Sequence, residues 1–353
     1  MKTGRSVDGL AAELLRQKET KHDYIADTRK LRMTAGESSH IRVEMELPQG
    51  DTILDVTPLC HTQIGQHVHI PKPYYDRMRS SAPELLAENV NHWLHSDPAN
   101  RMVRTLDNNA RAFLSNKYRP LDNADLMEAI YPKLEQTELN IQSCELTETR
   151  MYIKAVSERV HGDVKVGDTV QAGIVISNSE VGSGALSIQP LLYRLVCLNG
   201  MIRNDHQMRR VHTGSRHNGG DDAAWELYSD RTREQSDKAI FMQARDLVDA
   251  FLKPDFFNTM LDELRAATKD AIVGDDIPKI VERTAKSLSL KEDESNSVLK
   301  RLVEGGDLTR WGMANAITNI AHDVEDYDRA TELERIGGQV IELPQKDWAT
   351  LVA

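Results

Sequence analysis

The stretch VKVGDTVQAGIVISNSEVGSGALSIQPLLYRLVCLNGMIRNDHQMRRVHTG, from Val164 to Gly214, decides the fold. Its first part alternates apolar with mostly polar residues up to Asn178, which is the period of a half-buried strand. A glycine-framed loop, SNSEVGSG, separates this part from a second apolar run, Ala185–Gln189. Together with an alternating segment that begins at Met151, these runs predict three antiparallel strands joined by turns.

The residues after Pro190 fit two different structures. Apolar side chains recur there at helical spacing as far as Leu198, and Asn199-Gly200 is a good left-handed helix stop. The same Asn-Gly pair also suits a type I′ turn between two further strands. We favour the helix Pro190–Leu198, and this gives the stretch a β-β-β-α order.

The flanking sequence is mostly helical in pattern. Helices are predicted from Ser6 to about Lys18, from Pro83 to Leu94, from Asn123 to about Ile130, and from near Asp307 to Gly337-Gly338, with a strand at His40–Leu47. The sequence therefore predicts an α+β protein whose central antiparallel sheet has a β-β-β-α core and flanking helices. We expect three regions, which are a helical N-terminal arm (1–40), an α+β core (41–218) and an acidic helical C-terminal region packing on the core (219–353).

The net charge of −11 is unevenly distributed. Residues 1–220 carry 27 basic and 27 acidic side chains, whereas residues 221–353 carry 17 and 28. No apolar run approaches the roughly 18 residues that a membrane span needs, so no membrane association is expected. The three cysteines are few and odd in number, which argues against a disulfide framework and favours the cytoplasm of the host cell.

Basic residues with neighbouring aromatic rings suggest a nucleic-acid-binding surface. Residues 191–220 hold five arginines against one acidic residue, and screening makes such local patches decisive over the total charge. Tyr118, with Phe113, Tyr152 and Tyr193, offers rings on which bases could stack. The predicted nucleic-acid-binding residues are Arg203, Arg209, Arg210, Arg216, His212, Lys117, Arg119 and Tyr118.

Metal and catalytic chemistry have weaker support. In CHTQIGQHVHI (Cys60–Ile70), His67 and His69 would share one face if they lay on a strand, but the second ligand pair of a zinc site is missing. No phosphate-binding glycine loop and no nucleophile motif is present. We therefore expect no catalytic residues, no metal and no cofactor. A metal-dependent nuclease using His67, His69 or His212 is the third hypothesis.

Four segments resemble a known family. They are RAFLSNKYRPLDNADL (Arg111–Leu126), GIVISNSEVGSGALSIQPLLYRLVCLNGMI (Gly173–Ile202), VHTG (Val211–Gly214) and NAITNIAHDVEDYDRATELERIGGQVIEL (Asn315–Leu343). They are similar to the phage/plasmid-like proteins, a domain of unknown function carried by bacteriophages, prophages and conjugative plasmids. The resemblance implies a role in DNA handling but brings no established catalytic residues. The β-β-β-α order is also similar to the core of Rad52-type single-strand annealing proteins, although fold alone does not imply function.

The sequence thus predicts a non-enzymatic phage or plasmid protein that binds single-stranded DNA and aids annealing, replication or protection. Its expected partners are single-stranded DNA, further copies of itself as a homo-oligomer, and phage or host DNA-processing proteins. The alternative is a protein-interaction or host-evasion module with an acidic helical surface and no DNA binding.

Overall fold

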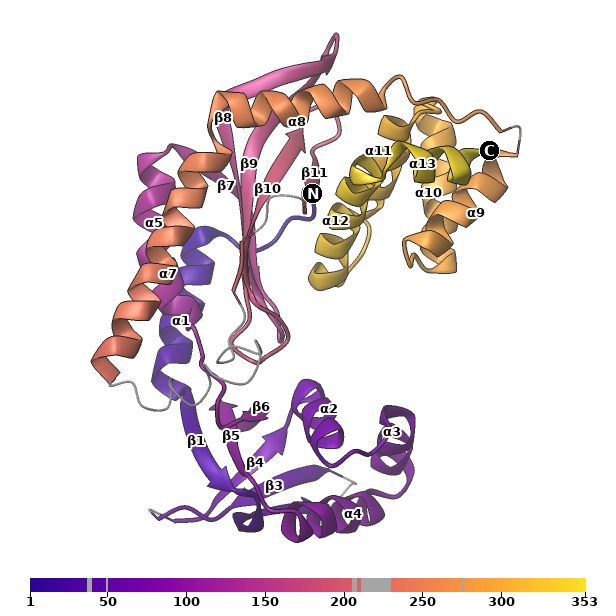
Figure 1. The fold of residues 1–353 in the computed structure, drawn as a ribbon. Coiled ribbons are helices and arrows are strands. Elements are labelled where there is room, and N and C mark those ends of the chain that lie inside the picture. The colour runs from indigo at the N-terminus through magenta and orange to yellow at the C-terminus, as the bar shows by residue number, and fades with distance from the viewer. Residues whose placement is uncertain (37–39, 49, 205–207, 211–229, 275) are drawn as a thin grey trace.

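The computed structural model describes residues 1–36, 40–48, 50–204, 208–210, 230–274 and 276–353, which form two six-stranded sheets surrounded by helices (Figure 1). The α+β class predicted from the sequence is confirmed. Among the helices of these residues, none is long and apolar enough to cross a membrane.

The first sheet lies at the bottom of Figure 1 and has the strand order β1-β5-β6-β4-β3-β2. Its strands are β1 (His22–Asp27), β2 (Leu31–Ala35), β3 (Ile41–Met45), β4 (Thr52–Val56), β5 (Asn100–Leu106) and β6 (Asn109–Ser115). A 3-10 turn, η1 (Thr28–Lys30), joins β1 to β2, and three helices cover one face: α2 (Pro58–His67), α3 (Lys72–Ser81) and α4 (Pro83–Ser96). The strand predicted at His40–Leu47 is β3, whose buried Ile41, Val43 and Met45 alternate with more exposed residues.

The second sheet is antiparallel and has the order β11-β10-β9-β8-β7, with β12 also pairing with β10. Its strands are β7 (Leu139–Leu146), β8 (Met151–Lys165), β9 (Asp168–Asn178), β10 (Leu186–Arg194), β11 (Asn199–Ile202) and β12 (Met208–Arg210). Ile153, Ile176 and Ile188 lie in one row across β8, β9 and β10. They face a core closed by α1 (Val7–Thr20), α5 (Asn123–Gln136) and α7 (Asp230–Phe251).

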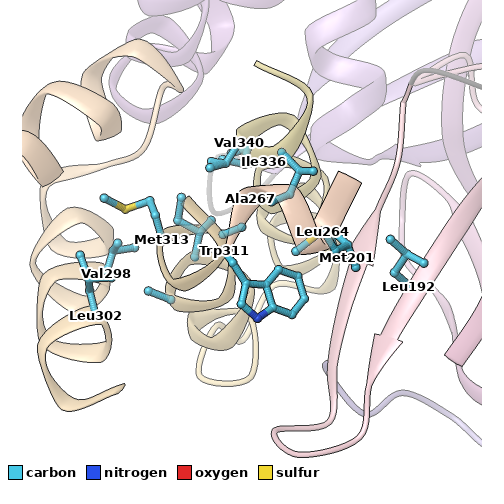
Figure 2. Close-up of a cluster of buried hydrophobic side chains, with 14 of the residues drawn as sticks. Leu192, Met201, Leu264, Ala267, Val298, Leu302, Trp311, Met313, Ile336 and Val340 are labelled. Carbon is cyan, nitrogen blue, oxygen red and sulfur yellow. The ribbon is translucent and has the colours of Figure 1, made fainter. Parts of the chain in front are cut away.

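The C-terminal helices also pack on the second sheet. They are α8 (Pro254–Ala267), α9 (Ile277–Ser287), α10 (Glu292–Gly305), α11 (Arg310–Ile320), α12 (Tyr327–Glu342) and α13 (Gln345–Val352). Figure 2 shows Trp311 of α11 among apolar side chains from α8, α10, α12 and the strands, with Leu192 and Met201 on the sheet side. Because neighbouring residues of a strand point to opposite faces, α12 contacts Lys154 on the side of β8 opposite Ile153.

The predicted helix Pro190–Leu198 is wrong. Residues up to Arg194 continue β10, a turn occupies 195–198, and Asn199-Gly200 begin β11 rather than forming the turn. The physical reason is that both faces of β10 are covered, so Leu191 and Leu192 are both buried and the strand loses its alternation. A doubly buried strand cannot be distinguished from a buried helix by periodicity alone.

Three other boundaries are corrected. The long helix predicted from Asp307 is two helices, α11 and α12, and Gly337-Gly338 lie inside α12 rather than after it. Gly338 allows a close approach, since a Cβ atom there would lie 2.0 Å from the carbonyl oxygen of Ile202. Helix α5 continues through Pro132 to Gln136. The proposed arm 1–40 is not only helical, because it contributes β1 and β2 to the first sheet.

A buried arginine joins the first sheet to the second. Arg104 of β5 is fully buried, and its guanidinium donates to Asp23 (2.7 Å), to Asp122 at the start of α5 (3.0 Å) and to the Glu180 carbonyl (2.7 Å). Glu180 belongs to the loop between β9 and β10, and its own carboxylate binds Arg111 of β6 at 2.6 Å. The polar SNSEVGSG loop is therefore a structural junction between the sheets.

Candidate anion-binding site

Two of the predicted nucleic-acid-binding residues are buried and hold the fold together. Arg203 is 1% exposed, and it donates to Glu342 of α12 (3.0 Å) and Glu263 of α8 (2.6 Å). Tyr118 is also buried, and its hydroxyl donates to the Ser179 carbonyl at 3.0 Å. In this structure neither residue presents a group to a nucleic acid.

The remaining predicted residues are dispersed. Arg209 lies on β12 at the edge of the second sheet, opposite Ser187, and is exposed. Arg210 is its neighbour on β12, but its side chain lies outside the described residues, as do His212 and Arg216. Lys117, which is exposed, and Arg119, which is half-buried, follow β6 of the first sheet. Of the four clustered arginines only Arg203 and Arg209 have described side chains, and of these Arg203 is buried and Arg209 is exposed.

Base stacking on the predicted aromatic residues is ruled out for this conformation. Phe113, Tyr118, Tyr152 and Tyr193 are between 1% and 7% exposed. A stacking platform must offer a ring face to solvent. The predicted mechanism therefore loses its stacking contribution and keeps only its phosphate contacts.

The histidine-rich segment does not lie on a strand. Residues 58–67 form helix α2, which turns His61 inward and ends at His67. The His61 ring hydrogen-bonds to the Tyr75 hydroxyl at 2.9 Å, and burial lowers the pKa of His61 to about 4. Within the part of the chain that the structure describes, no group of three His, Cys, Asp or Glu side chains could hold a metal ion.

A cavity of about 770 Å³ opens where the start of β8, the β9–β10 loop, the α9–α10 connection and α12 meet. Its walls carry both charged side chains and hydroxyl groups. The residues that matter for its chemistry are Arg150, Tyr152, Ser183, Lys291, Asp328, Arg329 and Arg335. We call it the arginine cavity.

Arg150 is held in the cavity wall by the glycine-rich loop. Its Nη2 atom donates to the Ser183 carbonyl at 2.5 Å. A Cβ atom on Gly184 would lie only 2.1 Å from this Nη2, so the loop needs a glycine there to accommodate the guanidinium. Arg150 forms no ion pair with any carboxylate of the described residues.

Arg335 approaches the same cavity from α12. Its Nε atom donates to the Gln189 side-chain oxygen at 3.0 Å, and it too has no carboxylate partner among the described residues. Burial lowers the pKa of Arg335, and the nearby positive charge of Arg150 lowers it further. Tyr152 lines the same cavity, and burial raises the pKa of its hydroxyl while the positive charges of Arg150 and Arg335 oppose that rise. Two like charges thus share a half-buried site.

The carboxylates of the cavity are already bound by other groups. Glu332 pairs with Arg329 at 2.6 Å, and Asp328 accepts a hydrogen bond from Thr147 at 3.1 Å. Lys291, the residue before α10, has no ion-pair partner in the described part of the chain. The lining carries four basic and three acidic side chains. Among the described residues, Arg150, Lys291 and Arg335 have no ion-pair partner, and neither do Asp326 and Asp328.

Such an arrangement favours a bound anion. A guanidinium offers paired donors that match a phosphate or carboxylate. A charge without a partner in a half-buried site is energetically unfavourable, and a bound anion would relieve this cost. Sequence reasoning missed Arg150 and Arg335 because they lie at opposite ends of a long segment and belong to no short motif. The one available signal was the glycine-framed loop, which the structure places over Arg150.

The chain is a two-sheet α+β protein with a cavity that is partly lined by arginines. A family model described as Domain of unknown function (DUF932) matches residues 112–336, and the chain belongs to this family. This confirms that part of the resemblance seen in the sequence, and the matched region holds Arg150, Lys291 and Arg335. No curated protein and no solved structure matches the chain.

Proposed function

We propose that this protein binds the phosphate groups of single-stranded DNA in the arginine cavity, as a non-enzymatic participant in annealing, replication or protection of phage or plasmid DNA. The observation that carries the proposal is that Arg150 and Arg335 face one cavity without a carboxylate partner among the described residues. Phosphates are the anions that arginine pairs select on nucleic acids.

Arg209 extends the proposed path. Residues opposite each other in an antiparallel pair point to the same face, so Arg209 shares its face with Ser187 and, two residues on, Gln189. Gln189 in turn binds Arg335. The β12 edge therefore supplies a further positive charge on the side of the sheet where the cavity lies.

Binding should depend on both cavity arginines. We expect the double variant Arg150→Ala with Arg335→Ala to bind a labelled 30-mer about 100-fold more weakly, since a charge-assisted hydrogen bond contributes about 1.5–3 kcal/mol. The slope of log affinity against log salt should fall by about 1.4, which is about 0.7 for each phosphate contact. Fluorescence anisotropy at several salt concentrations measures both quantities.

The matched control removes two exposed arginines that already have carboxylate partners. Arg16→Ala with Arg29→Ala changes the net charge equally, and both side chains pair with neighbouring carboxylates. This variant should bind like the wild type. Equal losses in the two double variants would reduce the effect to net charge and reject the cavity. Failure of the wild-type protein to bind at low salt would reject DNA binding and leave the acidic protein-interaction module as the better reading.

A further inference from the structure

The turn that carries Arg150 into the arginine cavity is tightly organised. Residues 147–150 connect β7 to β8, and Arg150 directly precedes β8. The Thr147 hydroxyl accepts the backbone N–H of Arg150 at 3.0 Å, and the Thr147 backbone N–H donates to the Arg150 carbonyl at 2.8 Å. The position of the Arg150 backbone therefore depends on the position of Thr147.

A single carboxylate holds this turn from outside. Asp328, in the first turn of α12, accepts hydrogen bonds from the hydroxyl of Thr147, at 3.1 Å, and from the hydroxyl of Thr149. A hydrogen bond to a carboxylate is roughly twice as strong as one between neutral groups. Because Asp328 and Arg335 both belong to α12, these contacts fix the turn that carries Arg150 relative to the helix that carries Arg335.

Asp328 acts on the cavity in two opposite ways. It is half-buried and lines the cavity, and its negative charge adds to the burial that raises the pKa of Tyr152. By charge alone, Asp328 therefore opposes a bound anion. Its oxygens, however, bind the threonine hydroxyls of the turn, whereas the Arg150 guanidinium donates to the Ser183 carbonyl. Through the turn, Asp328 keeps a guanidinium in the cavity wall.

We propose that the second effect dominates and that Asp328 is a positioning residue of the arginine cavity. It holds Arg150 at a fixed place relative to Arg335, so that a phosphate strand meets both guanidinium groups without first having to order the turn. Such preorganisation increases affinity because less conformational freedom is lost on binding. The inference rests on the proposed function, since the position of Arg150 matters only if it binds phosphate.

The test measures the binding of a labelled 30-mer by the Asp328→Ala protein. Although this variant removes a negative charge, it should bind about fivefold more weakly, because Arg150 loses its fixed position. The slope of log affinity against log salt should fall by about 0.7, as for the loss of one phosphate contact. Glu332→Ala is the matched control. It removes the same charge from the same cavity wall, but Glu332 pairs with Arg329 and not with the turn, so this variant should bind at least as tightly as the wild type.

A second replacement shows whether the effect passes through Arg150. Asp328→Ala should cause no further loss in an Arg150→Ala protein, whereas its fivefold loss should persist in an Arg335→Ala protein. Thr149→Val removes one of the two anchoring hydroxyls and leaves the net charge unchanged. It should weaken binding about twofold to threefold, with a cooperative thermal melt like that of the wild type.

The outcomes separate this inference from the proposed function. A folded Asp328→Ala protein that binds as tightly as the wild type, or more tightly, would overturn the positioning role and leave phosphate binding intact. Equal losses with and without Arg150 would overturn it as well. If Asp328→Ala does not fold, wild-type affinity of the Thr149→Val protein would overturn it instead. Failure of the wild-type protein to bind at low salt would overturn the proposed function together with this inference.

Discussion

Replacing Lys154 by methionine is expected to lower the free energy of unfolding by about 3–5 kcal/mol. Lys154 on β8 and Glu334 on α12 are both fully buried, and their charged atoms lie 2.7 Å apart. The ammonium also lies over the Tyr327 ring, 4.6 Å from its centroid. Without it, Glu334 keeps a buried carboxylate with no compensating charge. Urea denaturation followed by circular dichroism measures the loss.

The size of the effect comes from the unpaired charge and not from the pair itself. The double variant Lys154→Met with Glu334→Leu should therefore recover most of the lost stability, because well-packed apolar residues often replace a buried ion pair at little cost. Lys286→Met is the surface control, since Lys286 and Glu282 are 75% and 59% exposed and the pair should contribute less than about 1 kcal/mol. If the Lys154→Met protein unfolded with the same urea midpoint as the wild type, the Lys154–Glu334 pair would not be buried as described.

This ion pair also illustrates what the sequence hides. Lys154 and Glu334 are 180 positions apart, and each looks like an ordinary surface residue in its own segment. Arg203 is the opposite case. It lies among arginines in the sequence and was predicted to be a surface residue, but it is buried and donates to Glu342, which is 139 positions away. A cluster of charges in the sequence shows only the local composition. Which charges form ion pairs depends on which helices pack on which strands.

Local structure was predictable from the sequence where only one face of a helix or strand is buried. Helix α1 begins after Ser6 as predicted, and the Ser6 side chain accepts from the Gly9 backbone N–H. Strand β3 keeps the predicted alternation of buried and more exposed residues, because only one of its faces is covered. Strand β10 and helix α12 were misread because tertiary packing overrides the local signal, through burial on both faces of β10 and through the close contact at Gly338.

The candidate site was the least predictable part. The Tyr152 ring suggested stacking, but the structure buries it against Tyr327 at a centroid distance of 5.4 Å. Arg150 and Arg335 belong to different elements, and only the fold brings them to one cavity. The role that we propose for them rests on the absence of carboxylate partners among the described residues, which no sequence pattern encodes.

The second large effect concerns the centre of the sheet, where Ile174→Asp should abolish soluble expression. Ile174 is fully buried on β9, paired with Ala155 and Pro190. The sequence predicted that a Pro190–Leu198 helix would cover it, but its side chain packs in the core under α1, α5 and α7. An unpaired buried carboxylate costs several kcal/mol or more, which is comparable with the roughly 5–15 kcal/mol that stabilises a whole domain.

Two controls separate charge from position. Ile174→Val removes one methyl group and should cost only about 0.5–1.5 kcal/mol, with normal yield. Gln171→Asp places the same carboxylate three residues earlier on the same strand, at a half-buried position on the other face, and should remain soluble. The yield of soluble protein and a cooperative thermal melt are the measurements. A soluble, cooperatively melting Ile174→Asp protein would mean that this face of β9 is not the buried one, and the helices α1, α5 and α7 would then have to pack elsewhere.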